Sequence, residues 1–290
     1  MFRALGAYAA DMDAATDGGR RPVLARSRAL LDAAHLGPSV AVTVLTGLLA
    51  AAAGHGAGRG ALVVAAVAAG QLSIGWSNDL VDAPRDRQVG RTDKPLATGA
   101  VREGTVRVAT GVALGACVIL SLACGWRAGV AHLLLVVGSG WAYNLGLKRT
   151  AASAVPYAVA FGTLPAVVSL ALPHPVVPPA WMLATGALLG VGAHLLNALP
   201  DLADDEATGI RGLPHLLGAR TVRVLAPLVL LAGSAVAVLG PPGPVPLSSA
   251  VAGVLCVALA AVAVATRGRT PFLASIGIAL VDVVGLLLRS

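Results

Sequence analysis

Charge is scarce in this sequence, and that scarcity excludes a soluble globular domain. Only 12% of the 290 residues are Asp, Glu, Lys or Arg, which is about half the share that soluble domains carry. Cysteine is also rare, and Cys117, Cys124 and Cys256 all fall inside apolar runs. There they are expected to be small buried side chains. The chain is rich instead in hydrophobic residues, which make up 57% of it.

The hydrophobic residues are gathered into runs of about 20 residues, the length that crosses a bilayer as a helix. Lipid offers the backbone no hydrogen-bond partners, so such runs must be helical. The pattern predicts an all-α, polytopic membrane helical bundle with one domain over 28–290, preceded by a polar, disordered cytoplasmic segment at 1–27. Nine transmembrane helices are predicted, near 30–53, 60–82, 103–124, 127–147, 151–172, 180–200, 220–240, 246–265 and 270–288.

Basic residues lie almost entirely on one side of this predicted topology. With a cytoplasmic N-terminus, the inner segments hold 18 of the 21 Lys and Arg residues, and the outer segments keep Arg59, Arg127 and Arg289. The positive-inside rule gives this asymmetry for an odd number of spans. The net charge of +7 is therefore assigned to the cytoplasmic face of a multi-pass cell-membrane protein surrounded by lipids. It does not indicate nucleic-acid binding.

A first cluster of polar residues follows the second apolar run, in "SNDLVDAPRDRQVGRTDKP" at 77–95. Asn78, Asp82 and Asp86 are spaced at i, i+4 and i+8, so on a helix they lie within an arc of about 80°. Asp79 falls about 20° beyond Asp86 on the same helix. All four side chains can therefore point into one cavity at the cytoplasmic end of the span.

The same spacing returns four spans later, in "NALPDLADDEATG" at 197–209. Asn197, Asp201 and Asp205 again stand at i, i+4 and i+8, and Asp204 joins their face. Both clusters end a span on the cytoplasmic side, which suggests an internal repeat. Together they contain eight of the 14 acidic residues of the chain.

Bound cations are the better explanation of these clusters, although solvated carboxylates in interfacial loops are the alternative. Like charges crowded on one helix face repel one another, and an ionised Asp inside a membrane is costly. The available ligands are hard oxygens with no interleaved His or Cys, which suits Mg²⁺ and argues against zinc. Mg²⁺ commonly completes its shell with substrate phosphate, so ions held here could hold a diphosphate. The predicted metal ligands are Asn78, Asp79, Asp82, Asp86, Asn197, Asp201, Asp204 and Asp205.

Basic residues stand beside both acidic clusters. They either serve topology alone, as positive-inside residues, or form a clamp for a phosphorylated anion. Their grouping next to eight acids favours the clamp. The predicted diphosphate-binding residues are Arg85, Arg91, Lys94, Lys148, Arg149 and Arg211.

Five short pieces stand at the cytoplasmic ends of predicted spans: "NDLVDAPRD" at 78–86, "DKPLATG" at 93–99, "YNLGLKR" at 143–149, "NALPDLADD" at 197–205 and "GIRGLPHLLG" at 209–218. In these pieces and in the nine-span layout, the chain resembles the UbiA superfamily of intramembrane prenyltransferases. The resemblance implies a bundle around a central cavity with a cytoplasmic cap, where two Asp-rich motifs bind Mg²⁺ and an isoprenoid diphosphate. It makes Asp82, Asp201, Lys148 and Arg149 the catalytic candidates.

Two positions depart from the pattern of that family. Many members carry Asn-Asp at the start of the second motif, whereas Ala198 follows Asn197 here. Either one metal ligand is missing, or Asp204 supplies it. The usual Arg-Pro of the first loop is Lys94-Pro95 in this chain, which keeps the charge but loses the planar guanidinium fork.

Three activities are compatible with these motifs. The resemblance favours Mg²⁺-dependent transfer of a prenyl group to a small lipophilic acceptor, usually aromatic in this family, while a UbiA-type terpene cyclase is the alternative. A transporter is disfavoured because the clusters lie at span ends rather than at the midplane. Aromatic residues make up only 3% of the chain, and a cyclase benefits from aromatic faces, so transfer is preferred. The candidates for the substrate pocket, which could also be ordinary membrane packing, are Trp76, Tyr143, Tyr157, Phe161 and His194.

Overall fold

The structure is a computed structural model that describes residues 25, 27–207 and 209–289, with the side chains of 203, 204 and 207 left out. The expectation of disorder over 1–27 therefore lies almost wholly outside the described residues. Throughout the described part, every regular element is a helix. The all-α class predicted from the apolar runs is confirmed.

A short helical stretch at 27–32 precedes the labelled helices. The longer ones are α2 (Leu36–Ala52), α3 (Ala57–Gln88), α5 (Glu103–Ala123), α8 (Val155–Leu170), α9 (Ala180–Ala198), α11 (Leu213–Leu239), α12 (Leu247–Ala265) and α13 (Thr270–Leu287). The short ones are α4 (Pro95–Thr98), α6 (Trp126–Ala131), α7 (Gly138–Leu145) and α10 (Leu202–Ala207), with 3₁₀ turns at Leu147–Arg149 and Leu199–Asp201 and a π-helical stretch at His132–Val137.

Seven of the described helical segments are long and apolar enough to cross a membrane. The predicted spans near 30–53 and 151–172 correspond to α2 and α8, which are apolar but have only 17 and 16 helical residues. The predicted span 127–147 is one helical segment that changes from α to π and back to α. The membrane bundle is thus confirmed, and the count of nine crossings stays a prediction.

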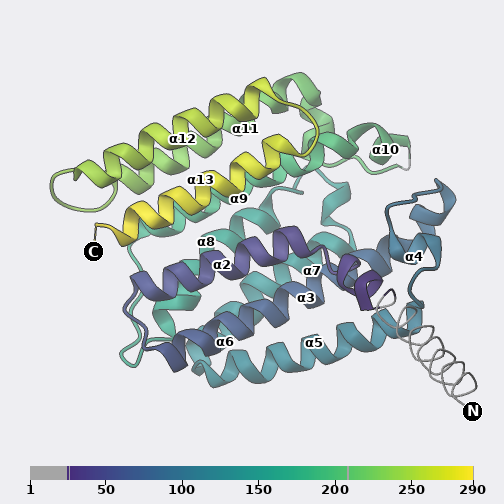
Figure 1. Cartoon of the computed structure of the whole chain (residues 1–290), viewed down its shortest axis with the longest axis horizontal. Coiled ribbons are helices and arrows are strands. Elements are labelled where there is room, and N and C mark those ends of the chain that lie inside the picture. Colours follow the sequence, from purple (N-terminus) through teal and green to yellow (C-terminus); the bar gives the residue numbers. More distant parts are fainter. Residues whose placement is uncertain (1–24, 26, 208, 290) are drawn as a thin grey trace, which may run out of the picture.

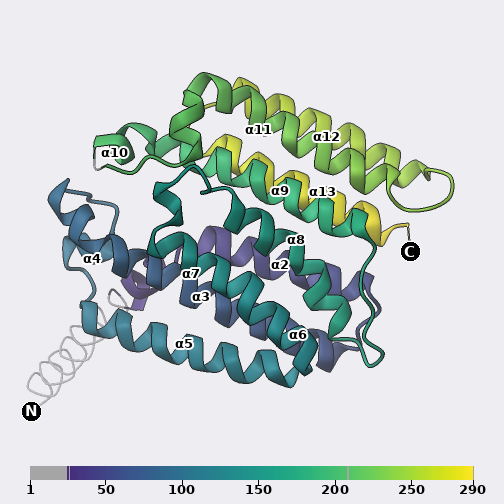
Figure 2. The same ribbon diagram turned by 180° about the vertical axis from the view of Figure 1, so that it is seen from behind.

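The helices form two groups that lie side by side (Figures 1 and 2). One group contains α9, α11, α12 and α13, and the other contains α2, α3 and α5 to α8. Helix α9 packs against both α8 and α11, and α13 packs against α2, so these contacts join the groups. Apolar clusters fill each group, and α4 and α10 lie together at one end, which we call the cap end.

Helix α3 carries the first acidic motif beyond its apolar part. It runs for 32 residues and continues through Pro84, which removes one intrahelical hydrogen bond, as far as Gln88. Asp82 and Asp86 therefore project from regular helix at the cap end. Helix α9 ends earlier, at Ala198, and the chain passes through a 3₁₀ turn into α10.

Candidate active site

Three carboxylates of α3 share a buried face, as their spacing predicts. Asp79, Asp82 and Asp86 are 2%, 4% and 2% exposed. Asn78 lies one turn before Asp82 and donates a hydrogen bond to the side chain of Asn144 on α7 at 3.0 Å. Burial of so many acids on one face requires compensation, and basic side chains supply it.

Arg85 connects the two acidic motifs. Its guanidinium lies 3.0 Å from Asp86, 3.6 Å from Asp82 and, across the cap end, 3.3 Å from Asp205 of α10. Burial raises the pKa of Asp205, and the charge of Arg85 opposes that rise. The second motif therefore faces the first, as the paired spacing suggested.

Arg91 makes a second connection through the loop after α3. It binds Asp93 with two hydrogen bonds, at 2.8 and 2.9 Å, and lies 3.5 Å from Asp201. The hydrogen bond from Arg91 holds the pKa of Asp93 down at about 2. Asp201 remains about half exposed, with 48% of its side chain accessible.

Lys148 reaches the first motif from the 3₁₀ turn after α7. Its ammonium group donates to Asp82 at 2.5 Å, and both side chains are buried. Burial lowers the pKa of Lys148, and the charge of Asp82 offsets only part of this effect. The loop before α11 packs directly on this turn, because a Cβ at Gly212 would lie 2.6 Å from the Lys148 carbonyl oxygen.

Asp79 is held by a pair of residues from two other segments. His35 Nε2 and Lys94 Nζ lie 3.1 and 2.9 Å from Asp79 Oδ1, and 3.0 Å from each other. His35 adopts a left-handed backbone (φ 52°) immediately before α2. The segment before it can approach α3 because Gly75 has no side chain: a Cβ there would clash with the Ala34 carbonyl oxygen.

The remaining predicted binding residues take no part in these ion pairs. Arg149 is exposed, and Arg211 pairs with Glu206 at 3.5 Å with both side chains largely exposed. Asn197 is half-buried and its side chain interacts with the Tyr157 hydroxyl. The side chain of Asp204 lies outside the described part of the chain, so its predicted role as a ligand stays a prediction.

Four of the five predicted pocket residues form one aromatic group. Tyr143 and Tyr157 meet edge to face at 5.2 Å, Phe161 stacks on Tyr157 at 6.2 Å, and His194 lies 4.8 Å from Tyr157. Both tyrosines are only half-buried, so their side chains keep some accessible surface. Trp76 is elsewhere: its indole donates to the Leu30 carbonyl, and its ring joins the apolar cluster of α3, α4 and α5.

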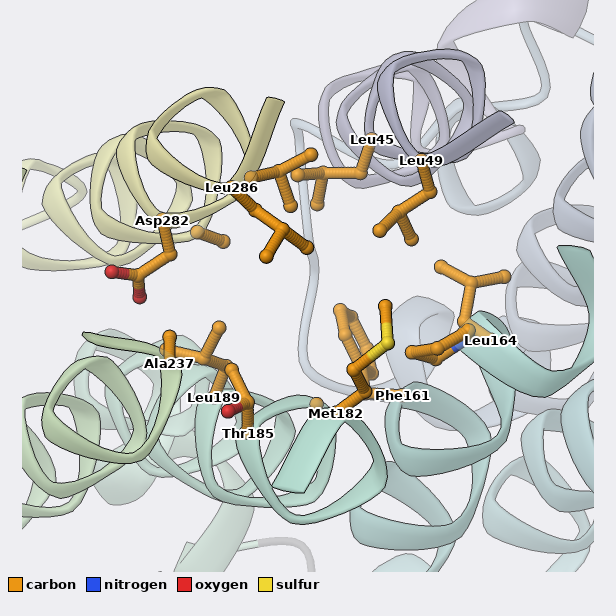
Figure 3. A pocket seen from close by; sticks show the side chains of 14 residues that line it. Leu45, Leu49, Phe161, Leu164, Met182, Thr185, Leu189, Ala237, Asp282 and Leu286 are labelled. Atoms are coloured by element: carbon orange, nitrogen blue, oxygen red, sulfur yellow. The ribbon is translucent and has the colours of Figure 1, made fainter. Parts of the chain in front are cut away.

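An apolar pocket continues from this aromatic group towards the far end of the bundle. It lies between α2, α8, α9, α11 and α13 and is partly open to the outside, and Phe161 belongs to both the aromatic group and the pocket wall (Figure 3). Leu45 and Leu49 lie on its α2 side, about 15–21 Å along the helix from His35. Asp282 lies at its edge and accepts hydrogen bonds from Ser234 at 2.8 Å and Cys256 at 3.4 Å.

The oxygen donors of the cap end fit a hard divalent cation, although their carboxylates are interleaved with basic groups. Within the described residues, no three His, Cys, Asp or Glu side chains are gathered closely enough to hold a metal ion. Asp79 Oδ2 is nevertheless buried and has no hydrogen-bond partner among the described residues. A cation would satisfy that oxygen, and carboxylate and amide oxygens suit Mg²⁺.

Sequence reasoning missed three polar residues of this region. His35 contacts Asp79 across 44 residues of sequence, and Ser153 contacts His194 across 41. Nothing in their local sequence signals these contacts. Asn144, which donates to the Ile74 carbonyl and the Ser77 hydroxyl, could have been found as the buried amide next to Tyr143 in "YNLGLKR".

Comparison with known proteins agrees with this fold. A model of the UbiA prenyltransferase family matches residues 40–275. A UbiA homologue from Aeropyrum pernix K1 is 15% identical, with a TM-score of 0.71 over 87% of this chain and 97% of that chain. A UbiA homologue from Archaeoglobus fulgidus bound to GPP and Mg²⁺ is also 15% identical, with a TM-score of 0.66 over 89% of this chain and 99% of that one.

A structure described as digeranylgeranylglyceryl phosphate synthase in membranes shares the fold as well. It is 15% identical, with a TM-score of 0.63 over 91% of this chain and 99% of that chain. No curated protein sequence matches this one. The fold and the family match define a helical membrane protein of the prenyltransferase type. This chain belongs to the UbiA prenyltransferase family.

Proposed function

We propose that this chain, as one domain over residues 28–290, transfers a prenyl group from an isoprenoid diphosphate to a lipophilic acceptor, releasing diphosphate. The proposal is supported by three environments that follow one another from the cap end into the bundle. Charged residues from α3 and α10 meet at the cap end, an aromatic group follows, and Phe161 leads into an apolar pocket. This order matches an isoprenoid diphosphate, which has a charged head and an apolar tail.

The basic residues of the cap end are proposed to bind the diphosphate. In this structure these basic side chains are paired with carboxylates: Lys148 with Asp82, Arg85 with Asp86, and Lys94 with Asp79. Phosphate oxygens would compete with these carboxylates for the same donors, because charge-assisted hydrogen bonds form with either anion. Arg149 and Arg211 are exposed, so they are proposed as outer residues that attract the anion.

Oxygens of both motifs are proposed to hold Mg²⁺, with Asp79, Asp82 and Asp86 on one side and Asn197, Asp201 and Asp205 on the other. When bound, Mg²⁺ would neutralise charge on the departing diphosphate. When an Arg or Lys of a cap-end ion pair moves to a phosphate oxygen, its Asp partner loses its counter-charge. That carboxylate can then bind Mg²⁺, so diphosphate binding and metal binding favour each other. We therefore expect Mg²⁺ and diphosphate to bind cooperatively.

The aromatic group and the apolar pocket are proposed to control the fate of the prenyl group once the diphosphate departs. The allylic C–O bond breaks with its electron pair on the diphosphate, and the cation left behind must be kept from water. Tyr143, Tyr157 and Phe161 offer aromatic faces to that cation. The acceptor then supplies the electron pair for the new bond. A cyclase would use the same first step with an internal alkene as nucleophile, and it remains the alternative.

The cap end is proposed to face the cytoplasm. The support is the distribution of basic residues, 18 of 21 of which fall on one side of the predicted topology. Arg85, Arg91, Lys94 and Lys148 engage the acidic motifs there.

Product analysis tests the proposed activity. Purified protein is incubated with dimethylallyl, geranyl, farnesyl and geranylgeranyl diphosphate, with and without Mg²⁺ and aromatic acceptors. Mass spectrometry should detect a prenylated acceptor, and diphosphate release should require Mg²⁺. A cyclic terpene formed without acceptor would select the cyclase, and absence of Mg²⁺-dependent release from all four substrates would contradict both activities.

A further inference from the structure

One ring nitrogen of His194 on α9 has a hydrogen-bond partner, and the other has none among the described residues. The residue is 1% exposed, and its Nε2 lies 3.0 Å from Oγ of Ser153, which is itself 0% exposed. The same Oγ accepts a 2.9 Å hydrogen bond from the backbone N–H of Leu213. His194 Nδ1 is buried and has no partner among the described residues.

The hydroxyl of Ser153 decides which nitrogen carries the hydrogen. Its oxygen already accepts from Leu213, and its own hydrogen needs an acceptor, for which Nε2 is in reach. A nitrogen that accepts from a hydroxyl carries no hydrogen, so the neutral ring bears its hydrogen on Nδ1. His194 thus presents a buried N–H donor, and an unpaired buried donor is costly.

The free donor belongs to a ring that contacts two half-buried tyrosines. The centroid of the His194 ring lies 4.8 Å from that of Tyr157 and 5.7 Å from that of Tyr143, and both tyrosines keep some accessible surface. His194 also precedes Asn197 by three residues, so it lies about 4.5 Å deeper along α9 than the nearest proposed metal ligand. If the diphosphate binds at the cap end as proposed, His194 lies on the side of it where the prenyl group begins.

A second buried histidine shows that a free nitrogen alone is not a site. His132 Nδ1 lies 2.7 Å from Ser121 Oγ, and its Nε2 is likewise unpartnered among the described residues. Its neighbours Cys117, Ser121 and Val137 are all buried, so none of these neighbours offers accessible surface. What distinguishes His194 is that the two tyrosines beside it keep some accessible surface.

We propose that His194 determines acceptor specificity by donating an Nδ1–H hydrogen bond to an oxygen atom of the second substrate, with Ser153 as the positioning residue that fixes the tautomer. The inference rests on the proposed prenyl transfer and extends it. The isoprenoid tail has no oxygen, and the diphosphate oxygens belong to the cap end, so the oxygen comes from the acceptor. The flanking tyrosine rings favour a flat molecule such as a phenol or a quinol.

A matched pair of probes tests this hydrogen bond. Binding of 1-naphthol and of naphthalene to the purified full-length protein is measured by fluorescence in lipid nanodiscs, with Mg²⁺ and inorganic diphosphate present. The wild type should bind 1-naphthol about tenfold more tightly than naphthalene, the ratio that one hydrogen bond gives. In His194→Gln, whose amide can still meet Ser153 but has no donor at the Nδ1 position, the ratio should fall to about one.

His132→Asn is the matched control. It keeps a partner for Ser121 and loses the other free histidine nitrogen, so the probe ratio should stay at the wild-type value. An unchanged ratio in His194→Gln would overturn the proposal, and so would the absence of saturable 1-naphthol binding to the wild type. Ser153→Ala provides a second variant should His194→Gln not fold: with the tautomer released, its ratio should fall several-fold, and an unchanged ratio would also overturn the proposal.

Diphosphate release, measured in parallel, separates this inference from the proposed function. Wild-type protein that prefers 1-naphthol through His194 but releases no diphosphate with any isoprenoid would sustain the oxygen-binding site and contradict prenyl transfer. Protein that releases diphosphate but shows the same probe ratio with and without His194 would contradict only the role of His194.

Discussion

Asp82 and Asp201 occupy equivalent positions in the two motifs but different surroundings. Asp82 is paired with Lys148 where only 6% of each side chain is exposed, whereas Asp201 faces Arg91 with 48% of its side chain exposed. Removing one partner of a buried pair leaves the other charge uncompensated. An exposed pair contributes little to stability. The two aspartates should therefore differ in stability effects even if both are needed for turnover.

Asp82→Asn and Asp201→Asn should each lower kcat by at least about a hundredfold, because each removes a carboxylate proposed to hold Mg²⁺. Only Asp82→Asn should also lower the free energy of unfolding, by about 3 kcal/mol. Steady-state kinetics and thermal unfolding in detergent measure the two effects.

A double variant separates the two roles of Asp82. Asp82→Asn combined with Lys148→Met removes both charges, so the free energy of unfolding should recover while activity stays lost. Near-wild-type activity in either single aspartate variant would contradict the two-motif metal site.

Sequence could predict the acidic face of α3 and could not predict what neutralises it. Asn78, Asp82 and Asp86 lie on one face because a helical period relates residues four apart, which is local information. His35 reaches Asp79 from 44 residues away, and only because Gly75 lets the chain approach α3. Such contacts depend on tertiary packing, which spacing does not encode.

At the level of elements, Arg85 holds α10 against α3. Helix α10 has only six residues, too few to be stable alone. Its Asp205 is bound by Arg85, a residue of α3 with 18% of its side chain exposed. The position of the second motif therefore depends on this ion pair more than on the intrinsic helicity of α10.

Arg85→Gln should loosen α10 without unfolding the bundle. Amide hydrogen exchange over residues 202–207 should become about tenfold faster, because an ion pair that ties the short helix to α3 is lost. Arg211→Gln is the control, since Arg211 also pairs with an α10 residue, Glu206, but on the exposed surface. Its exchange should match the wild type, and equal exchange in both variants would argue against a bridging role for Arg85.

Hydropathy predicted where the helices lie but not where a helix changes its type. Hydropathy found every long helix of the described bundle, including α2 and α8, because apolar length is a local property. It could not show that 127–147 changes from α to π-helix at His132, where the ring packs against Ser121 and Gly70. Trp76 was also predicted to line the pocket, whereas its ring packs into the apolar cluster of α3, α4 and α5.

At the scale of the whole molecule, orientation in the membrane follows from charge. Gln88 lies at the cap end beside the first motif, and Val176 lies in the loop between α8 and α9. Both are exposed, while all three native cysteines are buried. Introduced cysteines at these two positions should therefore report orientation without interference.

A membrane-impermeant maleimide added to intact cells should label Val176→Cys and spare Gln88→Cys, because the basic cap end is expected to face the cytoplasm. Permeabilised cells are the control, in which both positions should react. Labelling of Gln88→Cys from outside intact cells would reverse the proposed topology.

The apolar pocket should set the length of isoprenoid that the protein accepts. Leu286 of α13 and Met182 of α9 line its part furthest from the cap end, so a long tail would reach them while a short one would not. Leu286→Trp should lower kcat/KM for geranylgeranyl diphosphate about tenfold, since overpacking a filled pocket costs about 1–3 kcal/mol. Values for dimethylallyl diphosphate should stay unchanged.

Leu273→Trp, on an exposed position of the same helix, is the matched control and should leave both substrates unaffected. Equal losses for short and long substrates in Leu286→Trp would show that the pocket does not receive the tail.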